Sequence, residues 1–322
     1  WLDTVAETPI VSLVSDTGTS ASDKITSIGT LSLGAVEAAA TVEYSVDGGL
    51  TWAGTFAAVE GKNSVQVRQT DPAGNVSTAT KFEFTLDTVV APPVVSLTSD
   101  TGESATDRIT KVGTLLLSNL ESGSTLSYSI DGGKSWSPTF TAKEGANAVS
   151  VRQIDAAGNA SDGTAIDFTL DTKAPAVLTV ALANDTGSSA TDKITSDGSL
   201  VLGGQEAGAT VEYSIDKGVT WQTSFTPAEG ANSIRVRQTD TAGNSSTAAT
   251  LSFTLDTKAP AALVVALAAN TCIDPTATIP STSNGKLSVT GIETGAVVEY
   301  SLNGGPWLVA FTAVQGTNVV QA

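Results

Sequence analysis

Hydrophobic and polar residues alternate along most of the chain in short runs, which is the pattern of half-buried β-strands. In one such run, Leu126, Tyr128 and Ile130 fall on one face and polar residues on the other. The run ends at Asp131-Gly132-Gly133, where glycine supplies the positive φ that a hairpin turn needs. No stretch shows a helical period, so the pattern predicts an all-β fold.

The strands expected between residues 93 and 170 are short and close together. They lie at 93–97, 113–118, 125–130, 136–142 (one or two strands), 148–154 and 166–170. About seven short strands in roughly 85 residues are typical of an immunoglobulin-type β-sandwich. The segment between the first two strands is rich in Ser, Thr, Gly and Asp and is expected to be a loop.

The same pattern recurs along the chain. Tyr44, Tyr128 and Tyr213 are 84 and 85 residues apart, and a tryptophan in each copy repeats these intervals. Self-similarity at a fixed period is typical of tandem arrays. We therefore predict the tail of a preceding repeat at 1–5, Ig-like repeats at 6–89, 90–174 and 175–259, and a divergent fourth repeat at 260–322 that stops before its last strand. The sandwiches are expected to follow one another end to end as a rod cut from a longer array.

Composition narrows the chemistry. The chain has 33 acidic and 16 basic residues, a net charge of −17, so it is expected to repel nucleic acid and anionic lipid. No run approaches the roughly 18 apolar residues of a membrane span, and no direct membrane insertion is expected. There is no His and a single Cys, Cys272. The usual nucleophile–histidine pairs and imidazole zinc sites are therefore excluded, and we do not expect an enzyme.

A loop of eleven residues carries the acidic signal. It reads DTGTSASDKIT from Asp16, DTGESATDRIT from Asp100 and DTGSSATDKIT from Asp185, with two aspartates seven residues apart in each copy. In the expected topology this loop lies at the pole where the chain leaves a domain, beside the aspartate of a Leu-Asp-Thr motif. A DxAGN turn lies at the opposite pole and would face it across the junction between two domains.

These acids predict a metal site at each junction. Carboxylates gathered this closely need a counter-ion, and an all-oxygen ligand set suits Ca²⁺ better than the small octahedral shell of Mg²⁺. An isolated Asp or Asn often only starts a turn, and the DxDxDG pattern of an EF-hand is absent. The candidate ligands are Asp3, Asp16, Asp23, Asp71, Asn75, Asp87, Asp100, Asp107, Asp155, Asn159, Asp171, Asp185, Asp192, Asp240, Asn244 and Asp256.

Other recurring residues have simpler expected roles. Trp52, Trp136, Trp221 and Trp307 could be sugar platforms, but packing at the rim of the core is the favoured interpretation. The outward Arg68, Arg152 and Arg237 are expected to pair with acids. Glutamates before glycine at 60, 144 and 229 are expected in turns near the exit pole, where they could support a metal from outside its ligand shell.

The fourth repeat departs from the other three. Asn270 stands where an aspartate is expected, and Thr278 lies near the position of the second one. Asp274 could compensate, but we expect a weakened or altered site there. Cys272 lies in the same loop and is expected to be an inert, unpaired thiol.

The motifs DTGxSxxDxIT, YSxDGGxxW, VRQxDxAGN and FTLDT, in this order and with this period, resemble the bacterial Ig-like domains of giant repetitive surface adhesins, including those secreted by type I systems (RTX-type). The resemblance covers three repeats and most of a fourth. It implies Ca²⁺ bound between and within domains, with Asp16, Asp23, Asp87 and their counterparts as ligands.

The expected function is therefore structural: an extracellular, cell-surface extender segment that supports adhesion or biofilm formation and is stiffened by Ca²⁺. Its partners would be the neighbouring repeats and, through other domains, a distal host or surface receptor. Two alternatives stay open. One is a module that binds glycan or protein, and the other is a subunit of a filament or phage appendage.

Overall fold

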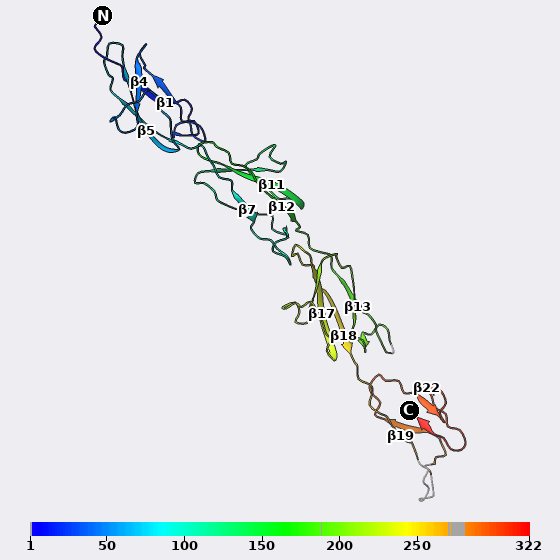
Figure 1. Ribbon diagram of the computed structural model, residues 1–322. Helices are drawn as coiled ribbons and strands as arrows, with labels where there is room; N and C mark the ends of the chain where they lie inside the picture. The colour runs from blue at the N-terminus through cyan, green and yellow to red at the C-terminus, as the bar shows by residue number, and fades with distance from the viewer. Residues whose placement is uncertain (1, 188, 270, 272–280) are drawn as a thin grey trace.

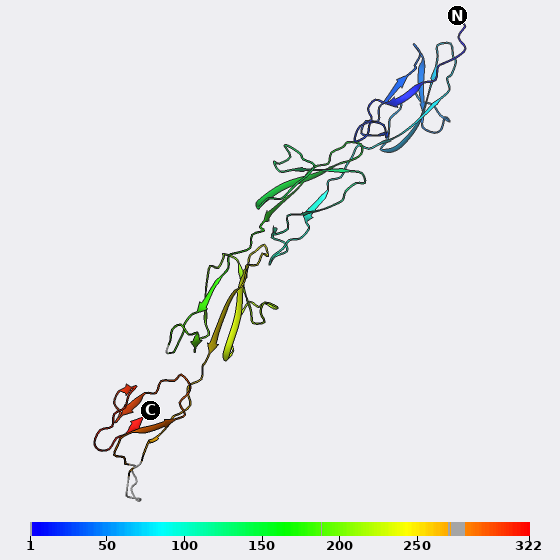
Figure 2. The ribbon, with the colours of Figure 1, turned by 180° about the vertical axis from the view of Figure 1, so that it is seen from behind.

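The computed structural model describes residues 2–187, 189–269, 271 and 281–322. The repeats follow one another end to end in a long, thin rod, and both views show the same succession (Figures 1 and 2). The described residues form strands, turns and loops without a helix. They accordingly include no helix long and apolar enough to span a bilayer. The expected all-β fold of tandem Ig-like sandwiches is confirmed.

The described residues of each of the first three repeats form six strands. The first has β1 Ile10–Leu13, β2 Ile25–Thr26, β3 Leu31–Gly34, β4 Thr41–Ser45, β5 Gly61–Thr70 and β6 Thr80–Leu86. The second has β7 Val94–Leu97, β8 Ile109–Thr110, β9 Leu115–Ser118, β10 Thr125–Ser129, β11 Gly145–Ile154 and β12 Thr164–Leu170. The third has β13 Thr179–Leu182, β14 Ile194–Thr195, β15 Leu200–Gly203, β16 Thr210–Ser214, β17 Gly230–Thr239 and β18 Ala249–Leu255.

Two sheets face each other in each of these repeats. In the second repeat β7 and β9 form an antiparallel pair, and the other sheet has the order β10-β11-β12-β8. Apolar and polar residues alternate along β11, so that one face of the strand points into the core. On this face Val149 and Val151 are 2% and 0% exposed and pack with Phe168 between the sheets. Burial of such side chains is the main stabilising contribution in a sandwich of this size.

Two features of the strands differ from the expected pattern. β8 lies inside the segment expected to be a loop, and it pairs in parallel with the end of β12, with Ile109 opposite Thr169. Conversely, the strand expected over 136–142 is reduced to a single bridge between Tyr128 and Ser137. Thr110 explains the first difference: its fully buried hydroxyl donates to the carbonyl of Ser99 and ties β8 to the start of the acidic loop.

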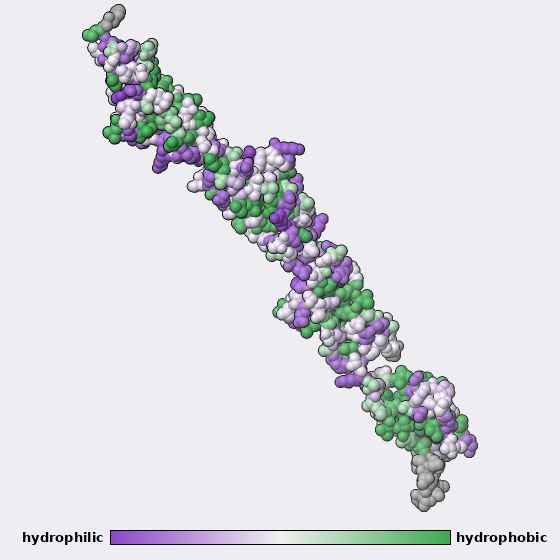
Figure 3. Space-filling model, viewed as in Figure 1, coloured by the Kyte–Doolittle hydropathy of each residue, from purple (hydrophilic) through white to green (hydrophobic). Residues whose placement is uncertain are grey.

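The fourth repeat is built from fewer paired residues. Its described strands are β19 Val264–Leu267, β20 Leu287–Thr290, β21 Tyr300–Leu302, β22 Trp307–Leu308 and β23 Val320–Gln321. It shows a broad hydrophobic area in the space-filling view (Figure 3), and Trp307 and Leu308 are more than half exposed. The predictions made for Asn270, Cys272, Asp274 and Thr278 lie outside the described residues.

Candidate metal centre

Three carboxylates meet at the junction between the first and second repeats. Asp87 follows β6 of the first repeat, whereas Glu121 and Asp155 belong to the second. Oxygen atoms from all three side chains lie within 4.8 Å of one another. The group therefore contains ligands from both repeats, as the sequence predicted for Asp87 and Asp155.

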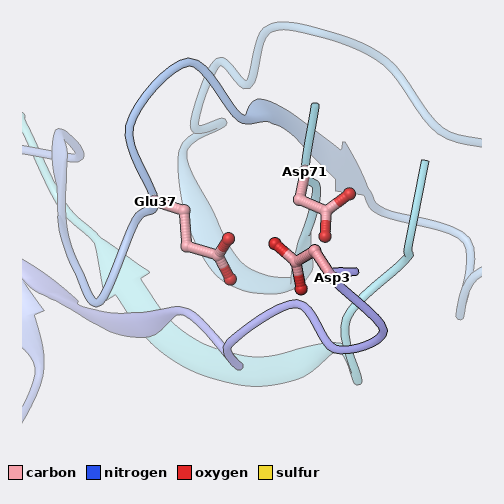
Figure 4. A group of neighbouring side chains, drawn as sticks. All are labelled: Asp3, Glu37 and Asp71. Carbon is pink, nitrogen blue, oxygen red and sulfur yellow. The ribbon is translucent and has the colours of Figure 1, made fainter. Parts of the chain in front are cut away.

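A second group of the same kind lies at the N-terminal pole of the first repeat. It consists of Asp3, Glu37 and Asp71, whose carboxylates point toward one another in Figure 4. Asp3 belongs to the predicted tail of a preceding repeat, so this group is the counterpart of the first junction. Sequence reasoning placed the two aspartates of each group but missed the glutamate.

The side chain of Asp155 closes the turn that carries it by accepting hydrogen bonds from Asn159. Asp155 accepts from the backbone N–H of Asn159 at 2.8 Å and from its side-chain amide at 2.7 Å. The same amide donates to the carbonyl of Asp87 at 2.8 Å. Asn159, predicted as a ligand, thus acts through its nitrogen as a donor that connects the two repeats, and Asn75 and Asn244 do the same toward Asp3 and Asp171.

Glu121 is positioned by a buried glutamine. Gln153 is 0% exposed, accepts from the backbone N–H of Glu121 at 2.9 Å, and donates to the carbonyls of Ala91 and Asn119. One side chain therefore fixes both the glutamate loop and the linker that enters the repeat. Gln69 and Gln238 make the equivalent bonds to Glu37 and Glu206. The signal was present in the sequence, because Glu37, Glu121 and Glu206 recur at the repeat period.

None of the ion pairs among the described residues involves Asp87, Glu121 or Asp155. Burial raises the pKa of Asp87 above its usual range, and the neighbouring carboxylates of Asp155, Glu60 and Glu121 raise it further. Two unit charges 4 Å apart repel by about 4 kcal/mol at an effective dielectric constant of 20. A divalent cation bound between these oxygens would reverse the sign of that interaction.

The aspartates of the acidic loop occupy a different position. Asp16 accepts from the backbone N–H of Lys24 at 3.0 Å, and Asp23 accepts from that of Ile25 at 3.0 Å, so both help to close their own loop. Asp100, Asp107, Asp185 and Asp192 make the same bonds. None of the six belongs to a three-carboxylate group among the described residues.

One oxygen of the first aspartate in each loop has no partner. The Oδ1 atoms of Asp16, Asp100 and Asp185 are buried and accept no hydrogen bond within the described part of the chain. A buried acceptor without a partner costs about 1–3 kcal/mol. This orphaned atom fits the predicted role of these aspartates as cation ligands, which stays a prediction.

The remaining predicted ligands lie at the later junctions. At the second junction the side-chain amide of Asn244 donates both to the backbone carbonyl of Asp171 and to the carboxylate of Asp240. These two aspartates do not form a close group with Glu206 within the same distance among the described residues. Asp256 follows β18 and accepts from the backbone N–H of Lys258 at 3.1 Å.

The recurring hairpins are satisfied internally and form no group of three carboxylates among the described residues. Asp131 accepts from the hydroxyl and the backbone N–H of Ser135 and from the hydroxyl of Ser129, and these bonds lower its pKa to about 2. The guanidinium of Arg152 lies 4.1 Å from the ring centre of Trp136 and covers one face of it. This stacking, which recurs on Trp52 and Trp221, supports packing at the core rim.

The predicted pairing of the stacked arginines holds for two of the three. Arg68 contacts Glu43 at 3.0 Å and Arg237 contacts Glu212 at 2.8 Å. Arg152 has Ser127 opposite it in place of a glutamate, and its Nε atom has no partner in the described residues. The glutamates at the exit pole lie in turns as expected; Glu60, for example, accepts from Thr88.

Comparison with known proteins agrees with this architecture. The family model described as bacterial Ig-like domain matches residues 4–88 and 173–257, which together are just over half of the chain. A model described as BNR/Asp-box repeat matches residues 127–138, the hairpin that contains Asp131. No match was found among curated proteins.

Proposed function

Because the chain belongs to the bacterial Ig-like domain family, a repeat module typical of extracellular and surface proteins, we propose that it is an extender segment of a bacterial cell-surface adhesin. In this role it holds a distal binding domain away from the envelope and supports adhesion or biofilm formation. Its junctions are stiffened by Ca²⁺, and it performs no catalysis. Its direct partners are the neighbouring repeats.

The observation that carries the proposal is the position of Asp87, Glu121 and Asp155. Their oxygens come from two repeats yet lie within 4.8 Å of one another. Without a cation they repel, and the repulsion acts between the two domains. With Ca²⁺ bound, the same atoms would hold the domains together.

The ligand chemistry fits Ca²⁺. The group offers only oxygen, from carboxylates that can bind through one or both atoms, and Ca²⁺ takes six to eight such ligands in flexible geometry. The buried, partnerless Oδ1 of Asp16 lies in the loop at the same pole and fits a further ligand or a second ion. Extracellular modules bind Ca²⁺ with dissociation constants of about 10⁻⁴ to 10⁻³ M, so millimolar Ca²⁺ would fill them.

Calorimetric titration of Ca²⁺ into the chelator-treated chain tests the metal site. We expect binding, weaker binding of Mg²⁺, and the loss of one site in the Glu121→Gln variant. Glu121 is the best position to change because its side chain accepts only from Ala91 among the described residues, whereas Asp155 also holds its turn.

The matched control is Asp167→Asn, which removes the same charge from an exposed position on β12. It should leave the titration unchanged. Absence of Ca²⁺ binding, or equal binding by the Glu121→Gln variant and the wild type, would contradict the proposal.

A further inference from the structure

A second contact joins consecutive repeats, and at the first junction its hydrogen bonds among the described residues involve no charged side chain. The acidic loop of the first repeat touches the DxAGN turn of the second: the Thr17 hydroxyl donates to the carbonyl of Ala157 at 2.6 Å. The backbone N–H of Thr19 donates to the carbonyl of Ala156 at 3.3 Å. The second junction repeats the first of these bonds, from Thr101 to Ala242 at 2.6 Å.

The glycine between these residues permits the contact. A Cβ atom on Gly18 would overlap with the carbonyl oxygen of Ala156, and one on Gly102 would overlap with that of Thr241. On the opposite side, a Cβ on Gly158 would lie 3.0 Å from the backbone nitrogen of Gly18. Backbone therefore meets backbone, and neither side has room for a side chain.

Burial of the turn depends on this contact. Ala157 and Ala242, which lie under a preceding loop, are both 0% exposed. The equivalent Ala73, which no loop among the described residues covers, is exposed. The loop supplies the cover that the turn otherwise lacks.

The described part of the third acidic loop, 185–187 and 189–195, keeps the local features of the first loop although no turn docks on it. Gly187 has φ of +97°, close to the +96° of Gly18, yet no described atom lies within 4 Å of its Cβ position. Thr186 keeps the bonds to Thr195 and Ser196 that Thr17 makes to Thr26 and Ser27. A preformed surface loses little conformational entropy on binding.

We propose that the DTG loop and the DxAGN turn of the following repeat form a metal-independent latch that sets the alignment of the two domains. The latch acts as the pivot of the junction, and the carboxylate group limits rocking about it. The surface of the loop thus fits one kind of partner, an Ala-Gly turn with exposed carbonyls. This inference stands whether or not the acids bind Ca²⁺.

The test is a distance distribution measured by pulsed electron resonance on the full chain carrying Cys272→Ser. Spin labels replace Lys62 and Ala146, which are exposed and occupy equivalent places on β5 and β11. In the presence of chelator, the distribution of distances between the two labels should be at least about twofold narrower in the wild type than in Gly18→Ala or Gly158→Ala. The width for Thr17→Val should lie between these values.

Matched glycines separate the latch from backbone strain. Gly187→Ala and Gly74→Ala place Ala at nearly the same positive φ, +97° and +91°, with no described atom within 4 Å of the Cβ position. They should lose thermal stability through local strain alone but keep the wild-type width of the distance distribution. Equal widths for wild type and Gly18→Ala in chelator would overturn the latch.

The same labels distinguish this proposal from the metal site. Ca²⁺ should narrow the wild-type distribution further if the ion stiffens the junction. If Ca²⁺ does not narrow the wild-type distance distribution, while the distributions of the glycine variants in chelator remain broad, only the proposed stiffening by Ca²⁺ is refuted. A wild type as broad as Gly18→Ala in chelator would refute the latch alone.

Discussion

The junctions before the second and third repeats share their backbone contacts but differ in their acids. At both, a threonine hydroxyl reaches an alanine carbonyl and an asparagine amide reaches the linker aspartate. Only the first brings its three carboxylates within 4.8 Å among the described residues. The hydrogen bonds between the DTG loop, the linker and the DxAGN turn are therefore kept at the second junction, although its three carboxylates do not lie within the same distance of one another.

The linker at the second junction is one residue longer than the linker at the first. Glu121 lies 34 residues after Asp87, and Glu37 lies 34 after Asp3, whereas Glu206 lies 35 after Asp171. The distance from the glutamate to the DxAGN aspartate is 34 residues in all three repeats, so the additional residue lies before it. Leu178, at the end of the longer linker, is buried at 2% exposed and replaces Pro93.

The largest effect is expected from the buried glutamines, because they hold the linker and the glutamate at once. Gln153→Leu leaves the carbonyls of Ala91 and Asn119 and the N–H of Glu121 without their partner. At about 1–3 kcal/mol each, the free energy of unfolding should fall by roughly 3 kcal/mol or more. Chemical denaturation followed by tryptophan fluorescence measures the loss.

Gln238→Leu sharpens the comparison at the second junction. It should lower the stability of the third repeat by a similar amount but reduce Ca²⁺ binding less, because Asp171, Glu206 and Asp240 do not form a close group at the second junction among the described residues. An equal loss of Ca²⁺ binding in both variants would mean that the close group of carboxylates is not what binds the ion.

The next largest effect should follow from changing the linker length. Deleting Lys173 gives Asp171 and Glu206 the spacing of 34 residues found at the first junction. We expect Ca²⁺ affinity at the second junction to rise by about tenfold, or 1.4 kcal/mol. Inserting one residue after Thr88 should weaken the first junction similarly, as calorimetry would show. Unchanged affinities in both variants would refute the role of spacing.

A smaller effect is expected from pH in the absence of metal. The raised pKa of Asp87 means that its ionised form costs stability in the folded junction. The loss of stability is full at pH values above the pKa of Asp87 in the folded protein and disappears below the usual pKa of 3.8. Acidification between these two values should therefore stabilise and stiffen the metal-free junction. The pKa of Asp71 is lowered by its bond to Asn75, so the stability it adds is lost on acidification.

Carbon-detected NMR titration of the carboxyl groups, combined with the label distances, would resolve these opposite trends. Asp87→Asn should remove the stiffening on acidification while leaving the titration of Asp71 in place. A normal or lowered pKa for Asp87 in chelator would contradict the electrostatic account.

The smallest effect concerns a bond found at the second junction. The Nζ atom of Lys111 donates to the carbonyl of Gly243 at 2.7 Å, and Ser27 occupies the equivalent place at the first. Because the side chain is exposed, Lys111→Ala should change junction stability by no more than about 0.5 kcal/mol. Differential scanning calorimetry with Lys134→Ala, an exposed lysine of the same repeat, as the matched control would measure it. A loss above about 1 kcal/mol would show that this bond contributes more than an exposed contact usually does.

The sequence predicted the sandwich because its information is local. Alternation along 125–130 and 148–154 identifies β10 and β11 without knowledge of their partners. The parallel pairing of Ile109–Thr110 with β12 could not be predicted in this way, because two residues show no period and the pairing depends on the buried Thr110. The same holds for 136–142, where hydrophobic residues fill the core without forming a strand.

The site was predicted in part for a similar reason. The sequence predicted that the aspartates of Leu-Asp-Thr and DxAGN meet at a junction, and Asp87 and Asp155 do lie close together because opposite poles of successive sandwiches adjoin. Glu121 was missed because its position depends on Gln153, a residue 32 places later that lies inside the core. The seven-residue spacing of Asp16 and Asp23 also serves to close the loop, and this second role is visible only in the hydrogen bonds.

Small-angle X-ray scattering of the whole chain, with Ca²⁺ and after chelation, tests the central claim most directly. If Ca²⁺ bridges acids from adjacent repeats, it stiffens the junction and keeps the rod extended. Chelation should then let the junctions bend, which lowers the radius of gyration and the maximum dimension of the chain. Added Ca²⁺ should restore both. Identical scattering curves in the two conditions would contradict the account.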